Sequence, residues 1–324
     1  MRSNSIFRRG ILATTLCLAT GVAPAQPYPN KPVRVVVPFA AGSATDTIAR
    51  TYAQKVSELL GQPAVVDNKP GANGQIGAEN IAKSAPDGYS ILIGTNSTNA
   101  ALKSLHKKLP YDQDTAFAPA AYLGSVPLIV AVNNDLPIKT LADLIAMAKA
   151  KPGQVSFASA STSQRVATEM LAGMAGIKLL MVPYKSSPNA VTDLMSGQVM
   201  MFTADFAVTL AQVKAGKIRG LAVTASERSA SIPELPTVAE AGGLKGYELI
   251  AWFGAFAPAG TPTEIVARLN EAFNAASNDA TVKSRLGAMG IETRPTTPQV
   301  LAEYVKSETV KWAKAIKDAG IEPE

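Results

Sequence analysis

The sequence predicts an α/β fold, because short runs rich in Val, Ile and Leu alternate with segments of helical periodicity. The runs predicted to be strands cover residues 33–39, 64–68, 90–94, 128–133, 155–158, 179–183, 199–203, 220–224 and 252–257. The segments predicted to be helices cover residues 44–60, 77–84, 141–150, 165–173, 189–196, 207–215, 263–277, 282–289 and 297–319. Several predicted strands end in loops of small polar residues, the position at which open α/β sheets bind ligands.

The first predicted helix, residues 44–60, illustrates how the elements are assigned. Its apolar residues, among them Ile48, Tyr52 and Val56, recur at helical spacing and share one face. Ser43 is placed to cap the first turn, with Asp46 as the acidic partner of a capping box. A glycine at position 61 is placed to end the helix.

Two extended segments, residues 122–133 and 247–260, are predicted to cross between two lobes, because the sequence pattern changes on either side of each. Two crossings divide the chain into one discontinuous lobe and one inserted lobe. We expect the first lobe to comprise residues 26–125 plus 250–324 and the second to comprise residues 126–249.

Residues 1–25 have the pattern of a secretory signal peptide. Arg2, Arg8 and Arg9 supply positive charge, and the apolar run at residues 10–22 is too short to span a bilayer. The run is followed by an A-x-A motif that ends at Ala25. We therefore expect cleavage after Ala25 and a periplasmic location.

The composition of the expected mature chain excludes several kinds of site. Cys17 lies within the signal peptide, so disulfides, thiolate metal sites and cysteine nucleophiles are excluded. His106 is the sole histidine, and the lysines around it predict a solvated surface position. The net charge of +6 falls to +3 without the three signal-peptide arginines, and no basic block indicates nucleic acid. Glycines at 71, 74 and 77 are spaced GxxGxxG rather than GxGxxG, which predicts a structural turn. We expect neither a metal nor a cofactor.

Five loops of small polar residues are the candidate binding segments, and they cover residues 39–46, 94–100, 159–165, 184–189 and 203–206. Backbone N–H groups at helix starts and Ser, Thr or Asn side chains suit the oxygens of an anionic ligand. Taken singly, each loop is better explained as an ordinary helix cap, whereas four or five in one chain favour a shared cleft. Asp46 could orient its loop or accept from a ligand amine, Lys185 could meet a carboxylate, and Asp205 could contact the ligand or cap a helix.

Long stretches of the chain resemble the periplasmic solute-binding proteins of tripartite tricarboxylate transporters, also called the Bug family. The resemblance lies in YPNKPVRVVVPFAAGSATDTIAR (28–50), VVDNKPGANGQIGAENIAKSAPDGYSILIGT (65–95), VPYKSSPNAVTDLMSGQV (182–199), IRGLAVTASERSASIPELPTVAEAG (218–242) and WFGAFAPAGTP (252–262). It implies a two-lobe, type II-like periplasmic binding protein with its ligand in the interlobe cleft. It further implies a monomer that is not an enzyme, takes a small carboxylic acid by hinge closure and meets membrane transporter subunits.

The resemblance also implies which residues contact the ligand. They lie in the loops after the first and third strands and in the inserted lobe: Phe39, Ala40, Ala41, Gly42, Ser43, Asp46, Thr95, Asn96, Ser97, Thr98, Ser161, Thr162, Ser163, Lys185 and Asp205.

The chain departs from the family pattern at three positions. Ser43 and Ser186 stand where glycine is common, and Arg165 stands where histidine is common. We hypothesise that Arg165 or the added hydroxyls meet a second polar group of the ligand.

Three other functions stay open on the sequence. They are a binding protein that docks on a membrane sensor, a periplasmic hydrolase, and the effector domain of a transcription regulator. A hydrolase is disfavoured by the single histidine and by the absence of a G-x-S-x-G elbow. A regulator would need a helix-turn-helix where the signal peptide stands.

Overall fold

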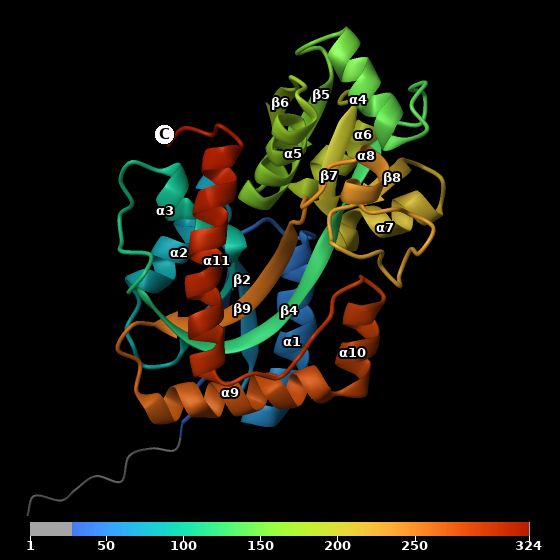
Figure 1. The fold of residues 1–324 in the computed structure, drawn as a ribbon. Coiled ribbons are helices and arrows are strands. Elements are labelled where there is room, and N and C mark those ends of the chain that lie inside the picture. The colour runs from blue at the N-terminus through green and yellow to red at the C-terminus, as the bar shows by residue number, and fades with distance from the viewer. Residues whose placement is uncertain (1–27, 324) are drawn as a thin grey trace, which may run out of the picture.

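The computed structural model describes residues 28–323 and confirms the α/β prediction; the predicted signal peptide lies outside these residues. The described residues contain a 9-stranded sheet with the order β2-β1-β3-β9-β4-β7-β5-β6, and β8 pairs with β4 beside this path. The sheet is divided into two lobes that share β4 (Figure 1).

The first lobe combines parallel and antiparallel strands. Strands β1 (Val33–Val37), β2 (Ala64–Asn68) and β3 (Ser90–Thr95) are parallel, whereas β9 (Ile250–Pro258) runs antiparallel to β3. The helical elements of this lobe are α1 (Ala44–Leu60), η1 (Ala72–Gly74), α2 (Gln75–Ala82), η2 (Ser97–Ala101), α3 (Leu102–Leu105), α9 (Thr263–Asn278), α10 (Ala280–Gly287) and α11 (Pro298–Asp318).

The second lobe is built around β7 (Met201–Asp205), which pairs with β5 (Ser156–Ser159) on one side and with β4 on the other. Strand β6 (Leu180–Pro183) extends the sheet beyond β5, and β8 (Arg219–Val223) pairs with β4. The helices of this lobe are α4 (Leu141–Ala150), α5 (Thr162–Ala175), α6 (Ser187–Met195), α7 (Phe206–Lys214) and α8 (Val238–Gly242).

Strand β4 (Phe117–Val132) runs through both lobes, as the long green arrow in Figure 1 shows. Its first part, residues 117–127, pairs with β9, and residues 128–132 pair with β7. The sequence predicted a strand only over residues 128–133, because the preceding stretch is rich in Ala, Gly and Pro, which are depleted in strands. The register between β4 and β9 shifts at two places in that stretch.

Helix α1 confirms the sequence prediction at both ends. Ser43 Oγ accepts from Asp46 N at 3.2 Å, and Gly61 adopts a left-handed conformation with φ 68°. The expected capping box is wrong in one detail, because the Asp46 carboxylate accepts from the Gly42 amide instead of the Ser43 amide. The apolar face of α1 is buried, and its Tyr52 hydroxyl donates to Leu123 O at 2.8 Å.

His106 differs from its prediction. It is half-buried rather than solvated, and its Nε2 is shielded from solvent. It directly follows Leu105, the buried last residue of α3. The sequence also missed η2, α3 and α8, which are too short to show helical periodicity. Within residues 28–323, no helix combines the length and apolar character needed to cross a bilayer.

Candidate functional site

One small cavity is lined by residues from both lobes, including two residues of β9. The space open to the centre of a water molecule is about 30 Å³, which is room for only about two or three waters. The residues that line it are Phe39, Ser43, Ala44, Thr45, Thr95, Asn96, Ser97, Ser161, Ser163, Gln164, Ser187, Asp205, Ala251 and Phe253. All five polar loops that the sequence singled out contribute to this lining.

Helices from opposite lobes begin at the cavity. Ser43 and Thr45 stand at the start of α1, Ser161 and Ser163 at the start of α5, and Ser187 at the start of α6. The first N–H groups of a helix have no partner within the helix, and the helix dipole makes this end positive. The arrangement favours an anion held from two sides.

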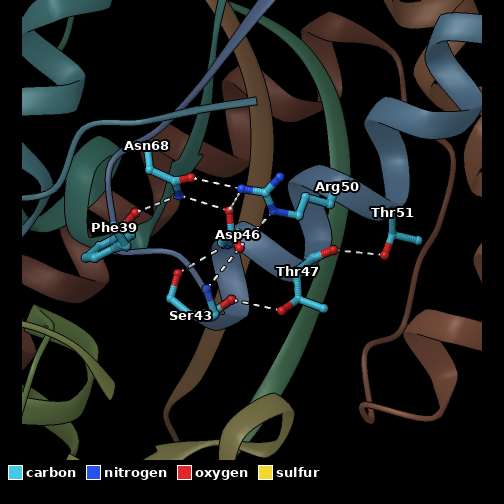
Figure 2. A network of polar contacts seen from close by, with 8 residues as sticks. Phe39, Ser43, Asp46, Thr47, Arg50, Thr51 and Asn68 are labelled. Atoms are coloured by element: carbon cyan, nitrogen blue, oxygen red, sulfur yellow. Dashed lines mark hydrogen bonds and ion pairs between the residues drawn. The ribbon is translucent and has the colours of Figure 1, made fainter. Parts of the chain in front are cut away.

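Asp46 orients the loop at the first of these helix starts, although it does not line the cavity (Figure 2). Its Oδ2 accepts from Gly42 N at 2.9 Å and from Arg50 Nε at 3.0 Å, and its Oδ1 accepts from Asn68 Nδ2 at 2.9 Å. Burial would raise the pKa of this carboxyl, but the bonds from Arg50, Gly42 and Asn68 outweigh it and lower the pKa. Asn68 also donates to Phe39 O at 3.0 Å, which ties the loop to β2.

Asn96 joins the two lobes directly. Its Nδ2 donates to Ser163 Oγ on α5 at 2.7 Å, while the hydroxyls of Ser97 and Ser163 lie 3.4 Å apart. Its Oδ1 accepts from the Trp252 amide of β9 at 3.4 Å. Asn96 is fully buried, so these contacts between the lobes are shielded from water.

Gln164 organises the second-lobe wall. Its Oε1 accepts from Ala160 N at 2.8 Å, and its Nε2 donates to Ser187 Oγ at 2.8 Å and, more weakly, to Asp205 Oδ2 at 3.5 Å. Burial raises the pKa of the Asp205 carboxyl, which ends β7. Of the two roles left open for Asp205, helix capping is not observed, because its side chain forms no capping hydrogen bond with α7.

The structure brings together about half of the residues that the resemblance implied. Those that line the cavity are Phe39, Ser43, Thr95, Asn96, Ser97, Ser161, Ser163 and Asp205. Those outside the lining are Ala40, Ala41, Gly42, Asp46, Thr98, Thr162 and Lys185.

The residues outside the lining differ in their surroundings. Ala41, Gly42 and Lys185 are exposed, whereas Thr98 and Thr162 are buried. Thr98 Oγ1 bonds within its own loop, accepting from Thr95 N at 2.9 Å. Arg165 is likewise absent from the lining, and its contact with a ligand stays a hypothesis.

Six lining residues were not among those implied: Ala44, Thr45, Gln164, Ser187, Ala251 and Phe253. The first four lie at helix starts, inside or next to loops that the sequence had marked, and differ from the implied residues only in helical register. Ala251 and Phe253 lie two apart on one face of β9, and nothing in an apolar strand distinguishes a cavity wall from core.

Comparisons with known proteins find similar proteins along nearly the whole chain. The sequence pattern of the family described as tripartite tricarboxylate transporter family receptor matches residues 48–321. A UPF0065 protein in the tcbD-tcbE intergenic region of Pseudomonas sp. (strain P51) is 40% identical over 319 residues, covering 96% of this chain and 94% of that protein. The structure of R. palustris Rpa4515 with adipate has a TM-score of 0.88 and 36% identity, covering 92% of this chain and all (100%) of that one. The structure of MatC (Rpa3494) from Rhodopseudomonas palustris with bound malate has a TM-score of 0.85 and 33% identity, and the match covers 89% of this chain and 100% of MatC.

Proposed function

The chain belongs to the tripartite tricarboxylate transporter receptor family, and we propose that it is a periplasmic solute-binding protein that captures a small carboxylic acid. The observation that carries the proposal is the convergence of helix starts from both lobes on one cavity. These ends hold a carboxylate best when the lobes are closed, so ligand contacts favour the closed state. Adipate and malate in two similar structures support a ligand of this class.

We propose that closure bends the shared strands, with residues 26–125 plus 250–324 as one lobe and residues 126–249 as the other. The pairing of β4 supports this division, since its partner changes from β9 to β7 near residue 128. The Asn96–Ser163 bond then forms only when the lobes meet.

The proposal includes a monomer that delivers its ligand to membrane transporter subunits and that is not an enzyme. Among the lining residues, all within the described part of the chain, none is His, Cys or Lys. A hydrolase would need a nucleophile beside a base, and the Asp205 carboxyl bonds to Gln164 instead of a serine in this wall. Membership of a transporter receptor family supports the partner.

A thermal-shift screen tests the function. A ligand that binds only the folded state raises the unfolding temperature, by an amount that grows with its concentration relative to Kd. We expect malate, adipate or a related acid to raise it, while neutral sugars and simple cations do not. A shift with sugars or cations and with none of the acids would refute the proposal.

Thr45→Val adds a test of the site itself. Thr45 is buried against the cavity, and valine keeps its shape while removing the hydroxyl. Loss of one hydrogen bond to the acid, about 0.5–1.5 kcal/mol, weakens binding about two- to tenfold. Thr47→Val is the matched control, because Thr47 donates to Ser43 O at 3.1 Å and lies outside the lining. Equal effects of the two variants would place the ligand elsewhere.

A further inference from the structure

Asp205 is the sole ionisable side chain among the residues that line the cavity, all of which belong to the described part of the chain. It is 9% exposed and stands at the carboxyl end of β7. The cavity is otherwise lined by hydroxyl, amide and apolar side chains. A carboxyl group therefore faces a cavity that the helix starts make favourable to a carboxylate.

No cation compensates this group within the lining. Gln164 donates weakly to this carboxyl, because its Nε2 lies 3.5 Å from Oδ2 and also donates to Ser187 Oγ at 2.8 Å. The strands packed against β7, which are β4 and β5, contain no charged residue. Charged residues on the surrounding helices lie outside the lining: Arg165 and Glu169 on α5, Asp193 on α6, Lys214 on α7, and Asp46, Arg50, Lys55 and Glu58 on α1.

Asp205 and the helix starts line the same cavity, so a carboxylate held at those helix starts lies near the Asp205 carboxyl. Two carboxylates in one desolvated site cannot both stay ionised at low cost, so one of them takes up a proton. Burial already raises the pKa of the Asp205 carboxyl before any ligand enters.

We propose that the protein captures its acid together with a proton, which Asp205 takes from solvent and uses to donate an O–H hydrogen bond to the ligand carboxylate. The inference rests on the proposed function and adds the protonation state of the complex. The balance is simple: one ligand carboxylate and one proton enter, Asp205 becomes neutral, and no covalent bond between heavy atoms changes. Neutral Asp205 then matches the donor character of the rest of the wall.

Calorimetry in buffers of different ionisation enthalpy tests the proposal. We titrate malate and adipate into the wild type at about pH 7 and about pH 8, where both acids are fully ionised. Wherever free Asp205 is ionised we expect uptake of up to one proton per ligand, and affinity falling by up to about tenfold per pH unit. Binding without proton uptake, and with affinity constant over this range, would refute the proposal.

Asp205→Asn distinguishes a protonated Asp205 that donates to the ligand from an ionised Asp205 that pairs with an ammonium group. The asparagine amide mimics a protonated carboxyl as a donor, so we expect affinity at about pH 8 to equal or exceed that of the wild type, without proton uptake. Glu169→Gln is the matched control, because Glu169 is a partly buried acid of the same lobe outside the lining whose pKa burial also raises. It should leave proton uptake unchanged.

Two outcomes would overturn the inference in different ways. If Asp205→Asn abolishes binding while the wild type favours amino acids, Asp205 acts as an ion that pairs with an ammonium group. If neither the wild type nor Asp205→Asn binds any carboxylate, the proposed function fails and the inference fails with it. Binding of acids without proton uptake leaves the proposed function standing and refutes the inference alone.

Discussion

Replacing Asp46 by asparagine tests whether one carboxylate organises the loop before α1. The asparagine side chain would keep a single acceptor oxygen where the Asp46 carboxylate now serves Gly42, Arg50 and Asn68. The bond from the Gly42 amide to a buried charge contributes about 1.5–3 kcal/mol, while the pair with half-exposed Arg50 contributes about 0.5–1 kcal/mol. We expect the free energy of unfolding to fall by about 2–4 kcal/mol at neutral pH, measured by urea denaturation.

The pH dependence of this loss gives a second measurement. The pKa of Asp46 is lower in the folded protein, so its contribution is complete above the pKa of the unfolded chain, near 3.9. It disappears as the pH falls through the folded pKa. The difference between wild type and Asp46→Asn should therefore shrink below about pH 4.

Asp67→Asn is the control for this experiment. Asp67 also forms two ion pairs, with Arg34 and Lys69 at 3.4 Å, but its side chain is 34% exposed. We expect a loss below about 1 kcal/mol. Equal losses in the two variants, or a loss for Asp46→Asn that persists at acid pH, would refute the reasoning.

Other buried polar groups give three further predictions. Asn96→Ala removes the direct bond between the lobes, and we expect a larger radius of gyration for the unliganded protein in X-ray scattering. The indole N–H groups of Trp252 and Trp312 donate to Glu308 Oε2 at 2.9 and 3.0 Å, and Glu308→Ala leaves both without an acceptor. We expect the free energy of unfolding to fall by about 2–5 kcal/mol in denaturant titration, and by less in Glu308→Gln. Burial raises the pKa of Asp205, so ionisation of this group destabilises the folded protein as pH rises. In calorimetry, Asp205→Asn should therefore unfold at a higher temperature than the wild type at neutral pH. Below about pH 4, where the carboxyl is protonated in both states, the two unfolding temperatures should converge.

Local signals explain which elements could be predicted from the sequence. Helix α1 has its apolar face, its cap at Ser43 and its stop at Gly61 within one short stretch, and the structure confirms all three. Strand β4 has no such signal at Ala118 or Pro119, because it is held by long-range pairing with β9. Tertiary pairing overrides weak strand propensity there.

The cavity was predictable as a set of loops but not as a set of side chains. The sequence placed the start of α5 at residue 165, whereas the helix begins at Thr162. Ser163 and Gln164 therefore belong to the first turn of α5, and both line the cavity. Likewise Ser187, at the first turn of α6, lines the wall while Lys185 stays exposed in the loop before it. Orientation at a helix start depends on single-residue register, which composition does not reveal.

The strand and core that the two lobes share have a consequence for how the molecule could be dissected. One continuous apolar core includes Val35 of the first lobe and Phe202 of the second, and β4 forms backbone hydrogen bonds in both. Excising residues 126–249 would cut β4 and divide this core, although residues 128–132 would keep their pairing with β7 and β8. The lobes therefore are not interchangeable modules, because a transplanted lobe would expose the apolar surface that its neighbour now covers.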